Sequence, residues 1–220
     1  MEPTLTSELQ RALPPDLPDR ARILDGARRH AELVLAANER LNLTRLTDPR
    51  DVAVKHVLDC LLPWRRFAGL APPGRERALA DLGSGAGYPA IPLALLLPHA
   101  RILLVESIGK KAAFLRDVVR ELDLSNCEIH AARAEELLAT RAVDLVVARA
   151  VGAARDLLRL LRPARGRFGR LLLYKGPDAE AELAQSARDA AKLGLAGSIT
   201  FRGELPEGAG VRALLEFAPT

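Results

Sequence analysis

Cysteine is scarce in this chain of 220 residues, which contains only Cys60 and Cys127. The two lie far apart, and neither belongs to a CxxC pair or a Cys/His cluster, which argues against both a disulfide framework and a zinc site. We expect two half-buried free thiols in a reducing cytoplasm. The four histidines also lack the spacing of metal ligands, so we expect no metal site.

Long apolar stretches are also absent. The longest candidate runs from Ala90 to Leu97, but it is broken by Pro92 and stopped by Pro98, far short of the roughly 20 residues that span a bilayer. The N-terminus lacks the basic region and apolar core of a secretion signal. With 49% hydrophobic and 27% charged residues, the composition is that of an ordinary soluble globular protein, and we expect a cytoplasmic location.

The positive charge of the chain is concentrated in one segment. The net charge is only +4, but residues 141–175 carry nine basic residues against Asp144 and Asp156, a local net charge of +7. Such a stretch suits a phosphate-rich partner such as nucleic acid. The alternative is that an arginine-rich chain simply covers its solvated faces with arginine. The nine residues are Arg141, Arg149, Arg155, Arg159, Arg162, Arg165, Arg167, Arg170 and Lys175.

Two helical patterns precede a linker rich in proline and glycine. Apolar residues recur at helical steps within 19–41 and again, after a proline that suits a helix start, within 50–67. The linker 68–76 is the best candidate for a boundary. We therefore predict an N-terminal helical extension over 1–70 and a core over 71–220, together forming one compact unit.

From residue 77 onward, apolar runs alternate with helical segments. Strict alternation favours right-handed crossovers and a parallel sheet covered on both faces. The last two strands flank a short Pro/Gly turn, so they can only pair antiparallel. This order resembles the α/β, Rossmann-like fold of class I S-adenosylmethionine-dependent methyltransferases: a seven-stranded, mostly parallel sheet with a C-terminal antiparallel hairpin, here preceded by N-terminal helices. We expect strands at 78–82, 101–106, 127–131, 143–148, 168–174, 197–203 and 211–217, and helices at 88–97, 109–122, 134–139, 153–162 and 178–193.

A glycine-rich turn, DLGSGAG, follows the first of these strands. Gly83, Gly85 and Gly87 let the backbone turn sharply and let a ligand lie against bare peptide groups. The GxGxG spacing differs from the GxGxxG of dinucleotide sites. Asp81 would repel a pyrophosphate, but it suits a ligand that carries an amino group and a sulfonium. The turn therefore predicts S-adenosylmethionine, bound by Asp81 and the three glycines.

Two further positions suit the same cofactor. Glu106 ends the second strand, where an acidic side chain accepts hydrogen bonds from both ribose hydroxyls. The alternative is a surface carboxylate at a strand end. Residues 132–135 (ARAE) lie where contacts to an adenine ring are usually made, but an ordinary helix start with glutamate in its first turn explains them equally well.

Several motifs together resemble the bacterial RsmG/GidB family. They follow the order and spacing of that family from about residue 38 to 176, and the SxGKK run is more specific than the glycine turn. The motifs are NLT at 42–44, KHVLD at 55–59, DLGSGAGYP at 81–89, ESIGKK at 106–111, FL at 114–115, ARAE at 132–135 and RA at 149–150.

This resemblance implies both an activity and a set of contacts. Members of the family are S-adenosylmethionine-dependent methyltransferases that modify N7 of a guanine in 16S ribosomal RNA. The resemblance therefore implies S-adenosylmethionine as cofactor and 16S RNA, or the small ribosomal subunit, as partner. Carried over by position, the implied cofactor contacts come from Gly83, Tyr88, Glu106, Ser107, Ala134, Glu135 and Arg149.

The chain departs from the usual residues of the family at several positions. Pro177 follows Lys175 and Gly176 where glutamine is common, which weakens the carry-over of contacts near that loop. The other departures are tolerable for cofactor binding: Tyr88 for Leu or Phe, Ala90 for Gly, Cys60 for Ser and Glu106 for Asp.

The implied reaction needs no general base. Guanine N7 carries a lone pair in the plane of the neutral base, so no proton must leave before it attacks. We therefore expect only positioning residues, with Arg149, His56 and Lys175 as candidates. The alternatives are an ion pair for Arg149, helix packing for His56 and a surface position for Lys175. We expect Arg162, Arg165 and Lys175 to contact RNA.

Two other functions remain open at this stage. A methyltransferase of the same fold that acts on a small molecule or a protein would need neither the basic segment nor the NLT and KHVLD motifs. A non-catalytic module that binds S-adenosylmethionine or RNA would look identical in sequence. The mild net charge and the lack of an obvious apolar patch favour a monomer.

Overall fold

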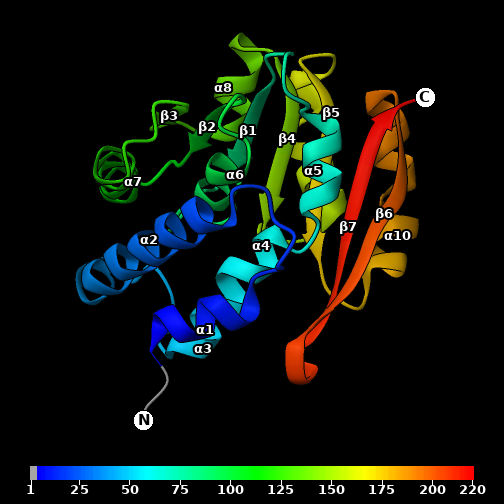
Figure 1. Cartoon of the computed structure of the whole chain (residues 1–220). Helices are drawn as coiled ribbons and strands as arrows, with labels where there is room; N and C mark the ends of the chain where they lie inside the picture. The colour runs from blue at the N-terminus through cyan, green and yellow to red at the C-terminus, as the bar shows by residue number, and fades with distance from the viewer. Residues whose placement is uncertain (1–3) are drawn as a thin grey trace.

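The protein is built on a seven-stranded sheet with helices on both faces (Figure 1). The computed structural model describes residues 4–220, so the first three residues of the expected N-terminal extension lie outside it. The strand order is β3-β2-β1-β4-β5-β7-β6, and β7 runs in the direction opposite to that of the other six strands, which confirms the expected topology. The strands are β1 (Ala78–Leu82), β2 (Arg101–Val105), β3 (Cys127–His130), β4 (Val143–Arg149), β5 (Phe168–Lys175), β6 (Leu195–Leu205) and β7 (Gly210–Pro219).

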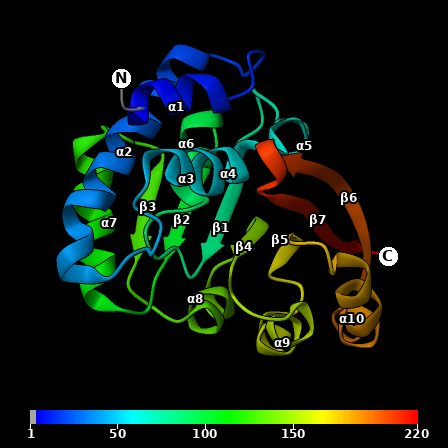
Figure 2. The same cartoon turned by 90° about the horizontal axis from the view of Figure 1, so that it is seen from below.

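Helices cover the two faces of the sheet (Figure 2). The N-terminal helices lie with the first two core helices on one face, and the last three helices lie on the other. The first group is α1 (Leu5–Ala12), α2 (Arg20–Leu41), α5 (Trp64–Leu70), α6 (Ala90–Leu96) and α7 (Gly109–Glu121). The second group is α8 (Ala134–Thr140), α9 (Ala154–Leu160) and α10 (Ala179–Leu193).

The N-terminal helices share one hydrophobic core with the sheet. Ile23 of α2 and Phe67 of α5 are fully buried in the same cluster as Leu93 of α6 and Ile102 of β2. Burial of apolar side chains is the main stabilising contribution to a fold. The helices before residue 70 are therefore packed as part of the molecule, whereas the division at that residue stays a prediction.

The segment 50–67 is not the single helix that its periodicity predicts. It forms α3 (Pro49–Asp51), a π-helix η1 (Val52–Leu58) and α4 (Asp59–Leu61), and Pro63 separates these from α5. Proline has no N–H to donate, so it interrupts the helical hydrogen bonds. A π-helix widens the turn and changes which side chains share a face, and it is frequent at functional sites.

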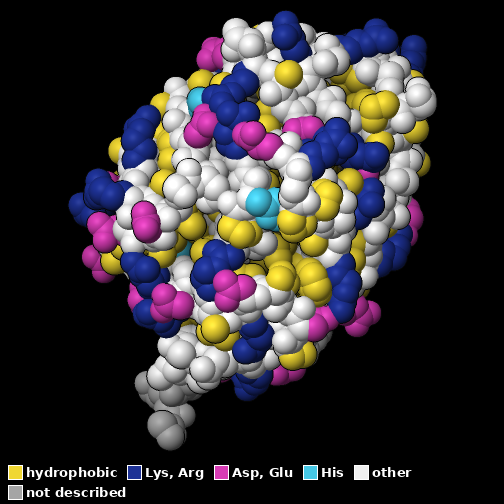
Figure 3. Space-filling view, turned by 45° about the horizontal axis from the view of Figure 1, so that its top comes forward, with side chains coloured by type: hydrophobic (Ala, Val, Ile, Leu, Met, Phe, Trp, Pro, Cys, Tyr) yellow, Lys and Arg dark blue, Asp and Glu magenta, His cyan; other side chains and the backbone are white. Residues whose placement is uncertain are grey.

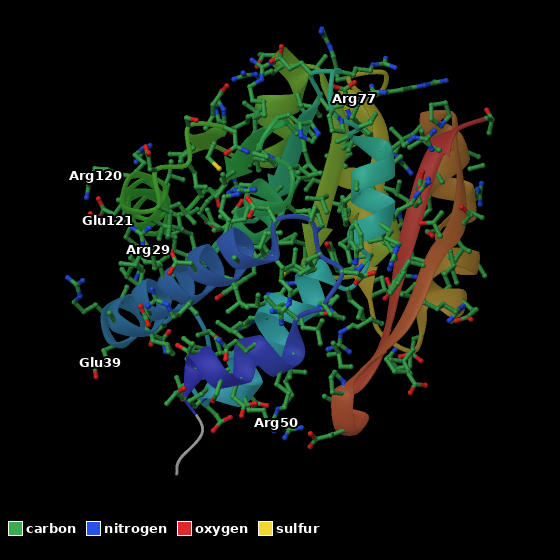
Figure 4. All side chains as sticks on the ribbon, in the orientation of Figure 1. Arg29, Glu39, Arg50, Arg77, Arg120 and Glu121 are labelled. Atoms are coloured by element: carbon green, nitrogen blue, oxygen red, sulfur yellow. The ribbon has the colours of Figure 1, made fainter. Side chains whose placement is uncertain are left out.

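The parallel strands give the sheet two functionally different edges. The loops that follow β1, β2, β4 and β5 leave at the carboxyl edge, where open α/β sheets bind their ligands. In Figure 4, Arg77 lies near the top, just before β1 at the amino edge, and Arg50 lies at the bottom. Arg50 pairs there with Glu207 in the turn between β6 and β7. Among the helices of residues 4–220, none has the length and apolar character required to cross a membrane.

Both cysteines are unpaired, and the burial of one of them differs from the expectation. Cys60 is fully buried rather than half-buried, while Cys127 is intermediate. Burial raises the pKa of each thiol to about 12, because the charged thiolate is poorly solvated inside the protein. Both side chains therefore act as small apolar groups at neutral pH.

Candidate functional site

The glycine turn after β1 has the backbone geometry that only glycine adopts easily. Gly83, Gly85 and Gly87 have φ angles of 73°, 55° and 93°. A Cβ atom on Gly87 would lie 2.8 Å from a side-chain carbon of Ile91 and 2.9 Å from Nε2 of His30. The turn is therefore held tightly against α6 and α2.

Asp81 is a buried carboxylate at the start of this turn. Its side chain is 0% exposed, and within residues 4–220 neither of its oxygens has a hydrogen-bond partner. Burial raises the pKa of Asp81 to about 7, although the nearby Ser84 hydroxyl, the positive charge of Arg149 and the Ala90 N–H act in the opposite direction. A carboxylate without a partner in the interior is costly, so this group is set up to receive a cation.

Glu106 lies at the end of β2, and its carboxylate supports the turn. One oxygen accepts a hydrogen bond from the Gly85 N–H (2.9 Å), and the other accepts one from the Ile108 N–H (2.8 Å). Glu106 is only 6% exposed, so the surface-carboxylate alternative is wrong. Each carboxylate oxygen can accept a further hydrogen bond, which leaves the ribose assignment open as a prediction.

A first cavity of about 230 Å³ opens beside this turn at the carboxyl edge. Four of the ten residues predicted to bind the cofactor line it: Gly83, Ser107, Ala134 and Glu135. The helix-start explanation of 132–135 is confirmed, because Ala134 begins α8, while the segment also forms one wall of the cavity and its contact to an adenine ring stays a prediction. Other walls of the cavity, which include Val151, Leu157 and Leu160, were not predicted from the sequence.

Tyr88 does not face this cavity, contrary to the expected cofactor contact. It is 5% exposed and lies between two histidines, with ring centroids 4.5 Å from His30 and 4.7 Å from His56. Within the described residues, its hydroxyl has no hydrogen-bond partner. Tyr88 therefore joins the glycine turn to α2 and η1 instead of lining the cofactor site.

His30 is a buried side chain that the sequence analysis did not single out. It is 0% exposed, its Nε2 lies 2.7 Å from the carbonyl oxygen of Ala86, and burial lowers its pKa to about 4. The neutral ring therefore donates Nε2–H to the glycine turn. A histidine at a core position of a helix carries no local signal for this role, because Ala86 lies 56 residues away in sequence.

A second cavity, of about 400 Å³, lies on the other side of the segment 149–151. Arg149 and Ala150 line it, whereas Val151 lines the first cavity. The NLT and KHVLD motifs meet at this place, because Thr44 Oγ1 lies 2.7 Å from His56 Nε2. Burial and the charge of Arg149 lower the pKa of His56 to about 4, so this ring is also neutral.

Arg149 uses most of its donors within the protein. Nη1 donates to the Lys55 carbonyl and to Asp59 Oδ2, both at 3.0 Å, and Nη2 lies 3.3 Å from His56 Nδ1. Arg149 therefore forms the ion pair that was the alternative to a functional contact. It does not line the first cavity, where a contact to the cofactor was expected. Arg212 of β7, which the sequence analysis missed, donates Nε to the other oxygen of Asp59 (2.8 Å).

Lys175 also differs from its expected role. Its ammonium group donates to Glu182 (2.7 Å) and to the Gly152 carbonyl (2.6 Å), and its side chain is only 10% exposed. It is therefore neither a free phosphate ligand nor an ordinary surface lysine. It ties the end of β5 to α10 and to the loop after β4.

Most basic residues of the segment 141–175 form ion pairs, and six of them pair with acidic residues from other parts of the chain. Seven of its nine basic residues form ion pairs. Arg162 pairs with Asp189, and both Arg162 and Arg165 precede β5 at the amino edge, opposite the two cavities. Figure 3 shows basic and acidic side chains interspersed over one face of the molecule. The expected RNA contact through Arg162 and Arg165 therefore does not agree with their position.

The carboxyl edge carries a different group of basic residues. Arg45 precedes Leu46 of the second cavity, Lys110 and Lys111 follow Ser107 in the first turn of α7, and Arg133 lines the first cavity. Arg45, Lys110 and Arg133 are exposed, Lys111 is half-buried, and none of the four pairs with a carboxylate of residues 4–220. We call these four the carboxyl-edge cations.

Comparison with known proteins identifies what this site resembles. The chain matches the GidB family, described as rRNA small subunit methyltransferase G, over residues 24–202. It is 45% identical over 213 residues to ribosomal RNA small subunit methyltransferase G of Solibacter usitatus, covering 97% of this chain and 99% of that protein. It is 34% identical to the protein of the same name from Carboxydothermus hydrogenoformans, covering 86% and 80% of the two chains.

Solved structures show the same fold at low sequence identity. The magnesium protoporphyrin IX methyltransferase of Synechocystis, solved with bound S-adenosylmethionine, superposes with a TM-score of 0.56 at 14% identity. The superposition covers 87% of this chain and 97% of that chain. The expected class I methyltransferase fold is thereby confirmed.

Proposed function

This chain belongs to the rRNA small subunit methyltransferase G family, and we propose from this membership that it transfers the methyl group of S-adenosylmethionine to N7 of a guanine in 16S ribosomal RNA. The observation that carries the proposal is the match over 97% of the chain to a relative named for that activity. A small-molecule or protein methyltransferase is not favoured, because the curated relatives that match this chain are named for ribosomal RNA. We further propose that the protein acts as a monomer in the cytoplasm.

The residues around the first cavity fit S-adenosylmethionine. The buried Asp81 carboxylate, which has no partner among the described residues, is matched by the α-amino group of the cofactor, and the bare glycine turn accommodates its methionine portion. Glu106 does not line the cavity but lies between Val105 and Ser107, which do, so we assign it to the ribose hydroxyls, and Ser107 and residues 132–135 to the adenine ring. When bound, the cofactor supplies a methyl group on a positively charged sulfur.

The protein contributes mainly positioning to this reaction. N7 of a neutral guanine attacks through its own lone pair, so the neutral His56 is not required as a base. Alignment of two reacting groups can supply up to roughly 7–11 kcal/mol of the acceleration. The network of His30, Tyr88, His56 and Arg149 fixes the glycine turn relative to the second cavity, which is the geometry that such alignment requires.

A transfer assay tests this function directly. Labelled methyl groups from S-adenosylmethionine are expected to enter purified 16S RNA or small ribosomal subunits, and mapping of the product is expected to place the label on one guanine. NAD is expected not to bind, because Asp81 would repel its pyrophosphate. The absence of transfer to RNA and subunits, with cofactor binding intact, would instead support the non-catalytic alternative.

We predict that RNA binds across the carboxyl-edge cations. Affinity for RNA falls as the salt concentration rises, and each phosphate contact contributes about 0.7–0.9 to the steepness of this fall on logarithmic axes. Changing Arg45, Lys110 and Lys111 together to alanine is therefore expected to make the slope less steep by about 2 to 3 in total. Affinity for S-adenosylmethionine is expected to stay unchanged. Filter binding of 16S RNA over a salt series measures the slope.

A matched variant controls for net charge. Arg165, Arg167 and Arg188 are three exposed arginines that lie away from the two cavities and form no ion pair within residues 4–220. Their triple alanine variant removes the same charge, and its salt slope is expected to equal that of the wild type. An equal fall in both variants would mean that RNA binding follows net charge and not the carboxyl edge.

A further inference from the structure

We propose that the second cavity holds the target guanine and that Arg212 recognises it by donating a hydrogen bond to O6. This inference rests on the proposed function and names the acceptor site within it. The cavity lies between η1, the carboxyl ends of β4 and β5, and β7. Its volume of about 400 Å³ falls in the range of small-molecule sites, and enzymes that modify a base commonly turn it out of its stack into such a pocket.

The position of the cavity suits an acceptor. The segment Arg149 to Val151 contributes to both cavities, and Ala150 in that segment has a φ of 57°, so the chain turns sharply there. A base in the second cavity would therefore approach the cofactor across this segment. The carboxyl-edge cation Arg45 lies at the rim beside Leu46, where a phosphate of the same RNA would lie.

Most polar side chains that line this cavity already form hydrogen bonds or ion pairs within the protein. Arg149 donates to Lys55, Asp59 and His56, Lys175 donates to Glu182 and Gly152, and the Tyr174 hydroxyl donates to the Cys60 carbonyl (2.7 Å). Arg212 is different. Its Nε donates to Asp59, and its Nη1 donates to the Val211 carbonyl (2.9 Å), but its Nη2 has no partner in the described residues.

Asp59 fixes the direction of this free donor. It is 5% exposed, and its two oxygens accept from Arg149 and from Arg212, which joins α4 to β4 and to the C-terminal hairpin. Arg212 is 24% exposed at its side chain, so its remaining donor is accessible from the cavity. A planar guanidinium held at Nε by a buried carboxylate is pre-organised for recognition of an oxygen.

The chemistry of the purines makes this donor selective. Guanine presents the O6 acceptor next to N7, whereas adenine presents an amino donor at the same place. A wall formed by Lys55, Arg149 and Arg212 therefore favours guanine and repels the amino group of adenine. Recognition through O6 alone also leaves the N7 lone pair free to attack the methyl group.

The test couples a protein change to a base change. Wild-type enzyme is expected to transfer methyl groups at least about tenfold more slowly when the target guanine of ligated 16S RNA is replaced by 2-aminopurine, which keeps N7 and lacks O6. Arg212→Met is expected to show the same loss on guanine and little further loss on 2-aminopurine. Arg212→Lys, which retains a donor, is expected to recover part of the guanine rate.

The outcomes separate recognition from a structural role. If Arg212→Met slows both RNAs by equal factors, or leaves the guanine rate unchanged, the proposal is overturned. Binding of S-adenosylmethionine, measured by calorimetry, shows whether the Arg212→Met variant is folded. If that variant does not fold, the same comparison of the two RNAs is made with Arg212→Lys, and its result decides whether the proposal stands. Arg202→Met, on the same hairpin and paired with Glu180, is expected to behave as wild type. Absence of wild-type transfer to guanine would refute the proposed function itself.

Discussion

Asp81→Asn is expected to weaken S-adenosylmethionine binding by about 2–5 kcal/mol, the usual cost of removing one partner of a buried charge pair. The side chain keeps its size and can still form hydrogen bonds, so the change isolates the charge. Isothermal calorimetry measures the affinity. Asp123→Asn provides a matched control, because Asp123 is exposed and has no ion pair in residues 4–220, and its affinity is expected to equal that of the wild type.

Asp81→Asn is also expected to remove the pH dependence of the affinity for S-adenosylmethionine. Because burial raises the pKa of Asp81 to about 7 in the free protein, part of the population is protonated at pH 6 and must lose that proton to pair with the cofactor amino group. Cofactor affinity of the wild type is therefore expected to rise between about pH 6 and about pH 7, with protons released to the buffer on binding. Affinity of Asp81→Asn that rises equally over this range would assign the titration to another group.

The stability of the protein without cofactor is expected to fall over the pH range in which the affinity for the cofactor rises. The pKa of Asp81 in the folded protein lies above its ordinary value of 3.8. Its contribution to the free energy of unfolding is therefore fully present below pH 3.8, where the group is neutral, and is lost as the pH rises through about 7. Above this pH, the free protein holds an unpaired buried charge. Asp81→Asn should therefore melt at a higher temperature than the wild type at about pH 8 in the absence of cofactor.

Elements with a strong local pattern could be predicted from the sequence. The alternation of apolar runs and helices after residue 77 predicted all seven strands, and the glycine turn fell where three positive φ angles are needed. Helix boundaries were predicted less reliably where a helix-breaking residue lies within a continuous apolar periodicity. Pro63 and the π-helix divide the stretch 50–67, although its apolar periodicity continues through both. The helix α1 was not predicted, because it is only eight residues long.

Charge pairing could not be predicted, because partners come from distant segments. Glu216 of β7 is 2% exposed and accepts from both Arg66 and Arg170, residues that lie 150 and 46 positions away. Asp189 of α10 likewise pairs with Arg159 and Arg162. A local sum of +7 counts only one side of these pairs. The cations that remain unpaired at the carboxyl edge come from three separate segments and therefore do not form one long basic stretch.

Replacing the target guanine by 7-deazaguanine is expected to abolish methyl transfer completely. The analogue has carbon at position 7 and therefore no lone pair there, while it keeps O6 and the Watson–Crick edge, so binding of the RNA is expected to survive. Single-turnover assays with saturating cofactor measure the chemical step. An unmodified RNA assembled by the same ligation is the control, and full activity on the deaza substrate would show that another atom accepts the methyl group.

The pH dependence of the same step distinguishes N7 from the other acceptors that a nucleotide offers. Attack by N7 releases no proton, so with cofactor saturating and the protein folded, the rate is expected to be nearly flat between about pH 6 and about pH 9. An exocyclic amine or a ribose hydroxyl must lose a proton, and its rate would rise with pH as the base that accepts the proton becomes available. The neutral His56 beside the second cavity could provide such a base, so a rising limb that disappears in His56→Gln would indicate a different acceptor and a catalytic role for this histidine.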